Sequence, residues 1–202
     1  MKLQKIGGYF SIALVFILLI YIGVTILGFS STDPADIMAT SQDSQIAFRA
    51  MYICIFLRGM LMLLISLTIK ERMHSEYPTL MQLVVITASI YFAMIILMSM
   101  NGMTRLSLSA DDLEVYKALI SVWNIFTKAA GCALGLVFLI IGYAAIKTRL
   151  LPRILGGIFL LQGITVIPTI LMGAPFIGVS LIPISFLWLG IHLIRNPEPN
   201  LE

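Results

Sequence analysis

Three positively charged side chains lie inside otherwise apolar stretches of this sequence, and they are its strongest candidates for chemistry. They are Arg49, Arg58 and Lys128. A cation at the centre of a membrane-spanning helix costs about 2.5–3.5 kcal/mol on insertion scales and usually pairs with a carboxylate. All ten Asp and Glu residues, however, fall outside the apolar stretches. The three cations therefore lack an acidic partner within the spans, and a buried one needs backbone carbonyls, hydroxyls, water or an anion instead.

Depth along the helix separates the three cations. Arg49 lies within about one turn of the start of its apolar stretch, where it can extend to lipid headgroups or to Asp43. Lys128 lies roughly 16 Å along a helix from Lys117, which leaves both snorkelling and burial open. Arg58 is about eleven residues from the end of its stretch. It therefore lies near mid-bilayer, out of easy reach of either surface.

The helical repeat predicts which polar residues meet Arg58. At about 100° per residue, Ser121, Asn124 and Lys128 share one helix face, whereas Arg49 and Arg58 point to opposite faces. We expect Arg58 to meet this polar face in a hydrated pocket for an anionic headgroup, a fatty acid or a small carboxylate. Alternatively, internal hydroxyls and carbonyls satisfy Arg58 and no ligand binds. The predicted ligand-binding residues are Arg58, Lys128, Asn124, Ser121, Arg49, Tyr91 and Gln162.

The residues of an enzyme are missing from the sequence. The two histidines form no paired metal motif, and Gly178-Val179-Ser180 is not a nucleophile elbow. Ser180 and His192 are about 18 Å apart on one helix, too far for a catalytic dyad. Cys54 and Cys132 match no redox or metal spacing. We therefore predict no catalytic residue, no metal and no cofactor.

The elements that position the cations are six apolar segments, each close to the roughly 20 residues that cross a hydrocarbon core as a helix. Hydrophobic residues make up 59% of the 202 residues and charged residues 11%, which is unlike a soluble domain. We expect an all-α bundle of six transmembrane helices, formed by residues 1–195 as one domain. A short polar tail follows at 196–202, and its Leu201-Glu202 is typical of a cloning scar. The six segments are 6–29, 46–69, 80–100, 118–146, 154–172 and 176–194.

Basic residues at the segment ends predict the orientation. If the N-terminus is inside, only Arg105 and Lys117 lie between segments on the outer side, and the positive-inside rule favours this arrangement. Both termini are then cytoplasmic. The net charge of +3 therefore reflects membrane topology and not a nucleic-acid interface. The cytoplasmic cations are Lys2, Lys5, Lys70, Arg72, Lys147, Arg149, Arg153 and Arg195.

Local signals predict helix starts and breaks. Asp33-Pro34 is typical of an N-cap followed by proline at the first helical position. Residues 109–112, with sequence Ser-Ala-Asp-Asp, resemble a capping box with Asp in place of Glu, so the fourth segment is expected to start outside the bilayer. Pro168 and Pro183 are expected to kink the last two helices.

Small residues predict where helices approach each other closely. Gly156 and Gly157 open the fifth apolar segment, and Gly131-x-x-x-Gly135 lies on the fourth. Glycines at such positions allow two helix backbones to come together in a membrane. We expect these residues to pack helices within the bundle.

Two stretches resemble an uncharacterised family of bacterial six-helix membrane proteins. That family has a phenylalanine and a Gly-Tyr late in its fourth helix, then Leu-Pro-Arg-x-Leu-Gly at the start of its fifth. Here these are Phe138, Gly142-Tyr143 and the run from Leu151 to Gly156. The start at residues 5–9, Lys-Ile-Gly-Gly-Tyr, is similar to the start common in that family. The resemblance implies a six-helix fold and a bacterial source, but no activity and no functional residues.

The sequence therefore predicts a multi-pass protein of a bacterial inner (plasma) membrane, with membrane lipids as partners and no nucleic acid. We expect a non-enzymatic protein that binds a lipid or small anionic ligand within the bundle, or an accessory subunit of a larger membrane complex. The alternative is a small transporter or channel that works as a homo-oligomer, which the proline breaks favour. An intramembrane enzyme ranks last.

Overall fold

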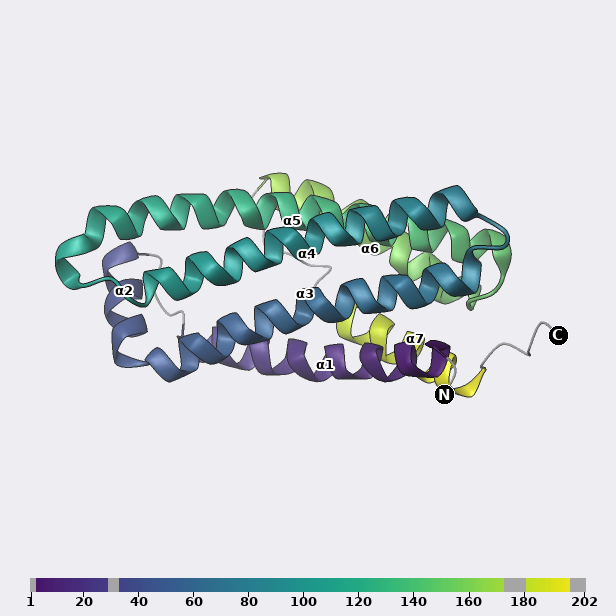
Figure 1. Ribbon diagram of the computed structural model, residues 1–202, viewed down its shortest axis with the longest axis horizontal. Coiled ribbons are helices and arrows are strands. Elements are labelled where there is room, and N and C mark those ends of the chain that lie inside the picture. Colours follow the sequence, from purple (N-terminus) through teal and green to yellow (C-terminus); the bar gives the residue numbers. More distant parts are fainter. Residues whose placement is uncertain (1–2, 29–32, 173–180, 197–202) are drawn as a thin grey trace.

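The computed structural model describes residues 3–28, 33–172 and 181–196, and these residues form helices joined by short connections (Figure 1). The predicted all-α class is confirmed. In chain order the elements are α1 (Leu3–Gly28), α2 (Pro34–Asp43), α3 (Gln45–Met73), α4 (Pro78–Arg105), the 3₁₀ helix η1 (Ala110–Asp112), α5 (Leu113–Thr148), α6 (Arg153–Met172) and α7 (Leu181–Arg195).

Five of these helices, α1, α3, α4, α5 and α6, are long and apolar enough to cross a membrane. They indicate a multi-pass membrane protein. The helix α7 is also apolar but has 15 residues. That length corresponds to about 22 Å, against a hydrocarbon core of about 30 Å. The rest of the expected sixth segment, residues 176–180, lies outside the described part of the chain, as do the expected scar at 201–202 and most of the tail.

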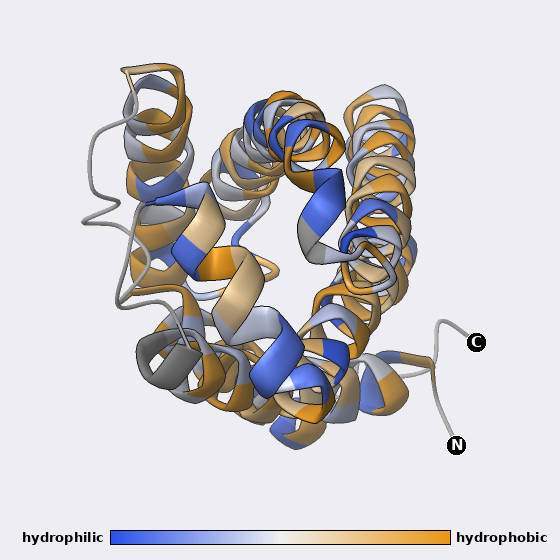
Figure 2. Ribbon diagram, turned by 90° about the vertical axis from the view of Figure 1, so that its left-hand side faces the viewer, coloured by the Kyte–Doolittle hydropathy of each residue, from blue (hydrophilic) through white to orange (hydrophobic). Residues whose placement is uncertain are grey.

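The long helices are arranged in a ring when the bundle is viewed end-on (Figure 2). The helix α1 packs against α3 and α7, α3 against α4, α4 against α5, and α5 against α6, while α6 and α7 pack against each other least. The start of α1 and the end of α7 lie together at one end, because a side chain at Gly8 would meet Ile194. We call this the termini end. The opposite end, where α2 lies, we call the α2 end (Figure 1).

Glycines bring α5 and α6 into backbone contact. A Cβ at Gly142 would lie 2.6 Å from the Leu160 backbone nitrogen and 2.7 Å from the Gly156 carbonyl oxygen. Gly135 likewise faces Ile167, and Gly131 faces Ile170. The predicted packing role is therefore confirmed for these glycines on α5 and for Gly156. It is wrong for Gly157, which has no atom within 4 Å of its Cβ position.

Three phenylalanine side chains pack together where α5, α6 and α7 meet. Phe138 lies 5.7 Å from Phe159 and 6.0 Å from Phe186, centroid to centroid. Beside them, the Gln162 side-chain amide donates a hydrogen bond to the Ser185 hydroxyl at 3.1 Å, and both side chains are fully buried. Aromatic packing of this kind fixes α7 against α5 and α6.

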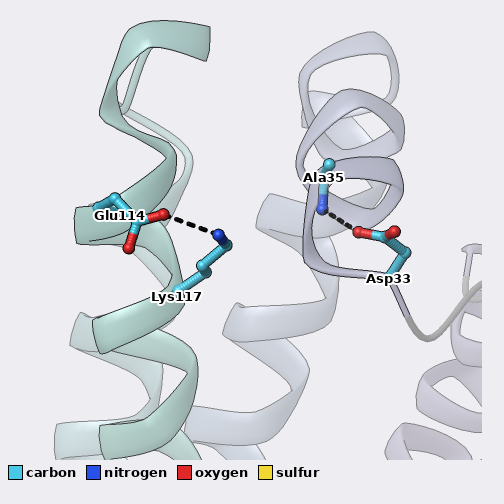
Figure 3. A network of polar contacts seen from close by, with 4 residues as sticks. All are labelled: Asp33, Ala35, Glu114 and Lys117. Atoms are coloured by element: carbon cyan, nitrogen blue, oxygen red, sulfur yellow. Dashed lines mark hydrogen bonds and ion pairs between the residues drawn. The ribbon is translucent and has the colours of Figure 1, made fainter.

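The predicted caps form at the α2 end. The Asp33 carboxylate accepts a hydrogen bond from the Ala35 backbone N–H at 2.8 Å, and Pro34 is the first residue of α2 (Figure 3). The Ser109 backbone N–H and hydroxyl both donate to Asp112, at 3.0 and 2.7 Å. These hydrogen bonds lower the pKa of the Asp112 carboxyl. The helix α5 then begins at Leu113, five residues before the apolar segment 118–146, as the capping signal predicts.

The connection between α5 and α6, residues 149–152, is held by a side chain of α3. Arg149 ends α5 in the left-handed conformation, with φ of 60°. The Arg72 Nε donates to the Leu150 carbonyl at 3.1 Å, and its Nη1 donates to the Asn196 carbonyl at 3.1 Å. Arg72 thereby donates to one carbonyl in the connection between α5 and α6 and to one just after the end of α7. Pro168 lies inside α6, and Pro183 is the third described residue of α7. The kinks expected at both prolines stay predictions.

Candidate functional site

A cavity of about 380 Å³ lies inside the ring of helices, with walls from α1, α3, α4, α5, α6 and α7. This volume falls in the range of roughly 300–1,000 Å³ that is typical of small-molecule sites. Most of the wall is made of leucine, isoleucine, methionine and phenylalanine side chains. Among the described residues that line the cavity, Arg58 is the only charged one.

Arg58 reaches the cavity from the middle of α3, as its depth in the sequence predicts. Its guanidinium carbon lies 5.4 Å from the ring centroid of Tyr21 on α1, a cation–π distance. Its Nε is buried and has no hydrogen-bond partner. Among the described residues, no carboxylate pairs with Arg58. In the described part of the chain, the groups that interact with this charge are two tyrosine side chains, Tyr21 on α1 and Tyr91 on α4.

Tyr91 on α4 supplies a second unsatisfied polar group to the same cavity. Its side chain is 2% exposed, and its hydroxyl has no hydrogen-bond partner. The hydroxyl lies beside the Arg58 side chain, close enough to interact with it both electrostatically and as a hydrogen-bond partner, but the two groups do not reach the distance and angle of a formed hydrogen bond. A buried polar group without a partner costs about 1–3 kcal/mol. An oxygen acceptor placed between these two side chains would satisfy both of them.

The predicted polar face of α5 lies elsewhere. Ser121, Asn124 and Lys128 do share one face, but all three are exposed, and none of them lines the cavity. The expectation that they meet Arg58 is therefore wrong. The face that α5 turns to the cavity instead carries Trp123 and Thr127, with apolar residues farther along the helix.

The position of α6 explains the exposure of this polar face. Seven residues separate Lys128 from Gly135, so the two lie within about 20° of each other on the helix. Gly135 faces α6, and Gly131 meets Ile170 near the end of α6 at Met172. The glycines of α5 that pack against α6 and the polar residues Ser121, Asn124 and Lys128 therefore lie along the same side of α5. The described part of α6 ends before it reaches the polar residues, so no described neighbour covers them.

The depth of Lys128 favours snorkelling over burial. If the hydrocarbon core starts at the basic residue Lys147, about 20 residues of α5 cross it, which reaches to about Thr127. Lys128 then lies at the opposite border of the core, from which its flexible side chain extends to the headgroups. Its charge therefore needs no partner inside the protein.

The other two predicted residues also lie away from the cavity. Arg49 is exposed near the start of α3, where its Nη2 donates to the Gln45 side chain at 3.4 Å. Gln162 is fully buried, but its bonds with Ser185 satisfy it, and it does not line the cavity. Of the predicted residues, the structure brings together Arg58 and Tyr91.

Arg105 is a buried cation that the sequence interpretation placed between two apolar segments on the outer side. It is 7% exposed at the end of α4. Its guanidinium carbon lies 4.7 Å from the Trp123 ring, 5.7 Å from the Tyr116 ring and 5.9 Å from the Tyr52 ring. Its Nη2 also donates to the Tyr52 hydroxyl at 3.2 Å. No local sequence signal marks this burial, because the three rings come from α3 and α5.

This aromatic box, formed by Arg105, Tyr52, Tyr116 and Trp123, adjoins the cavity. Trp123 belongs to both, because it also lines the cavity. Phe138 and Phe186 line the opposite end, toward the termini. The cavity is therefore bounded by packed aromatic side chains at both ends, with Arg58 and Tyr91 between them.

The sequence matches no family model, and comparisons with curated proteins and with solved structures find no similar protein. The resemblance to a bacterial six-helix family therefore stays a prediction from the sequence.

Proposed function

We propose that this protein binds a lipid or a small anionic amphiphile inside its helix bundle and does not catalyse a reaction on it. One observation carries the proposal. Arg58 Nε and Tyr91 Oη are buried polar atoms without hydrogen-bond partners, and their side chains line the same cavity. The rest of the wall is largely apolar, which suits a hydrocarbon group.

An anionic oxygen is the ligand group that this pair of residues favours. A guanidinium donates to a carboxylate or phosphate in a geometry that allows two parallel hydrogen bonds. In a low-dielectric interior such an anion also neutralises a charge for which the described chain provides no carboxylate. The Tyr91 hydroxyl can donate to the same anion. A cation or a neutral hydrocarbon would leave both groups unsatisfied.

The membrane arrangement belongs to the same proposal. We place six crossings in a bacterial inner membrane, with α7 as the last crossing and both termini in the cytoplasm. The basic residues Lys70, Arg72, Lys147 and Arg153 lie at helix ends on the termini side, which supports this orientation through the positive-inside rule.

Labelling tests the orientation. In a chain whose two native cysteines are replaced, a cysteine at Thr148 should react only with reagents that enter the cell, and a cysteine at Ser107 should react from outside. Reaction of the Thr148 cysteine from outside would contradict the orientation.

Native mass spectrometry of the purified protein tests the binding proposal. We expect a bound anionic molecule on the wild-type protein and its loss in Arg58→Leu. Arg49→Leu is the matched control, because it removes an exposed cation from the same helix and should keep the ligand. An equal amount of ligand on all three proteins would refute the proposal. Arg58→Lys should retain partial binding, because it keeps the charge but loses the paired donors.

A transporter or channel is the second candidate. The helices α6 and α7 both line the cavity, yet they pack against each other least around the ring, and Pro168 interrupts the hydrogen bonding of α6. Movement at this contact would open the cavity to one side. Transport predicts that liposomes containing the protein take up an anion that empty liposomes exclude. Bound ligand without such flux would favour binding alone.

A further inference from the structure

The length of the cavity can be estimated from the helix α5. Its cavity-lining residues run from Trp123 to Phe138, fifteen residues apart. At about 1.5 Å per residue, this span is about 22 Å. Its volume of about 380 Å³ lies near the lower end of the roughly 300–1,000 Å³ that is typical of small-molecule sites. The space therefore suits a molecule with one hydrocarbon chain, and a complete two-chain phospholipid is too large for it.

Both ends of this space are blocked by side chains that are held in place. At the termini end, Phe138 and Phe186 pack on each other and on Phe159. At the α2 end, Trp123 is stacked on Arg105. These packed side chains therefore limit the length of a chain that enters the cavity.

The polar contacts available to the ligand are also few. Besides Arg58 and Tyr91, the described lining residues with a side-chain N–H or O–H are Tyr21, Trp123 and Thr127, and the Thr127 hydroxyl already donates to the Trp123 carbonyl at 2.9 Å. A large headgroup with several polar atoms would leave most of them without partners, which costs free energy in an apolar site. One compact anionic group matches the available donors.

The geometry points to a ligand with a single hydrocarbon chain and one compact anionic group, such as a fatty acid or an alkyl monophosphate, held by Arg58 and Tyr91. A complete two-chain phospholipid does not fit. This inference rests on the proposed function and narrows its ligand class. The carboxylate and the phosphate share the same recognition chemistry, so the experiment must separate them.

Trp123 provides a reporter for the test. The chain has two tryptophans, and Trp188 does not line the cavity, so Trp188→Phe leaves one tryptophan in the wall. Bromine atoms on a bound chain would quench its fluorescence. The protein, in nanodiscs of zwitterionic lipid, is titrated with brominated single-chain carboxylates. Unbrominated alkyl phosphates and a two-chain phosphatidic acid are then added as competitors.

We expect saturable quenching by single-chain carboxylates, with affinity that rises with chain length and then levels off. Arg58→Leu should weaken binding about tenfold or more, because charge-assisted hydrogen bonds are lost. Ala130→Leu adds three carbon atoms to the wall and should shorten the longest hydrocarbon chain that binds by about three carbon atoms. Stronger competition by alkyl phosphates than by carboxylates of equal length would identify phosphate as the anionic group.

Two failures are distinguishable. If two-chain phosphatidic acid competes as well as a single-chain acid, and still depends on Arg58, the single-chain inference is overturned and the proposed function stands. If Arg58→Leu leaves single-chain quenching unchanged, the proposed function itself is overturned.

Discussion

The contact between α5 and α6 gives a sharp prediction about stability, and Gly142 is its centre. An alanine Cβ there would lie 2.6 Å from one backbone atom of α6 and 2.7 Å from another. Ordinary van der Waals contact begins near 3.4 Å, so the two backbones would have to separate by about 0.8 Å. Backbone atoms cannot rotate out of the way as the end of a side chain can. The shift would also loosen the neighbouring glycine contacts of Gly135 and Gly163.

The size of the effect follows from two opposing terms. Overpacking of a well-packed site costs about 1–3 kcal/mol. Alanine in place of glycine in a helix returns about 1 kcal/mol. Because the neighbouring contacts loosen as well, we expect Gly142→Ala to lower the free energy of unfolding by about 1–2 kcal/mol, which is a factor of roughly 5–30 in the folded-to-unfolded ratio.

Gly157→Ala is the matched control. It makes the same change on the partner helix α6, but at a position with no atom within 4 Å of the new Cβ. It should raise stability by about 0.5–1 kcal/mol. The assay is unfolding by sodium dodecyl sulfate in mixed micelles, followed by circular dichroism. If Gly142→Ala unfolds at the same detergent fraction as Gly157→Ala, the backbone contact is not as close as described.

Two further predictions concern the α2 end. Arg105→Met should lower the free energy of unfolding by about 1–2 kcal/mol, because three cation–π contacts are lost. It should also shift the fluorescence emission of Trp123. The control Arg49→Met should do neither. The second prediction concerns Asp112, because hydrogen bonds from Ser109 lower the pKa of its carboxyl. The cap therefore stabilises the fold above about pH 4, the ordinary pKa of an aspartate. This contribution is lost as the pH falls through the lowered pKa of the folded state. Ser109→Ala should raise the pKa of the Asp112 carboxyl in an NMR titration, and an unchanged value would contradict the cap.

Local signals predicted the helices and their ends well. The apolar segments are long enough to identify the five helices that could cross a membrane, and the caps at Asp33 and Ser109 depend only on neighbouring residues. The mid-helix depth of Arg58 also follows from counting along its helix. These features need no knowledge of which helices are neighbours.

The parts of the site that the sequence predicts wrongly depend on the rotation of α5 about its own axis. The helical repeat placed Ser121, Asn124 and Lys128 on one face but could not say where that face points. Their angular closeness to Gly135 was a usable signal, because a glycine face packs on a neighbouring helix. The burial of Arg105 could not be read locally, because its three aromatic partners come from two other helices.

Photo-crosslinking tests the central claim most directly, because it reports where the chain of a bound anion lies. A single-chain carboxylate with a diazirine on its chain would be bound, activated and mapped by peptide mass spectrometry. We predict labels on the cavity residues Met62 and Leu134, which disappear in Arg58→Leu. Labels confined to the outward-facing, exposed residues Ile125 and Ile164, and unchanged by that substitution, would contradict a ligand site inside the bundle.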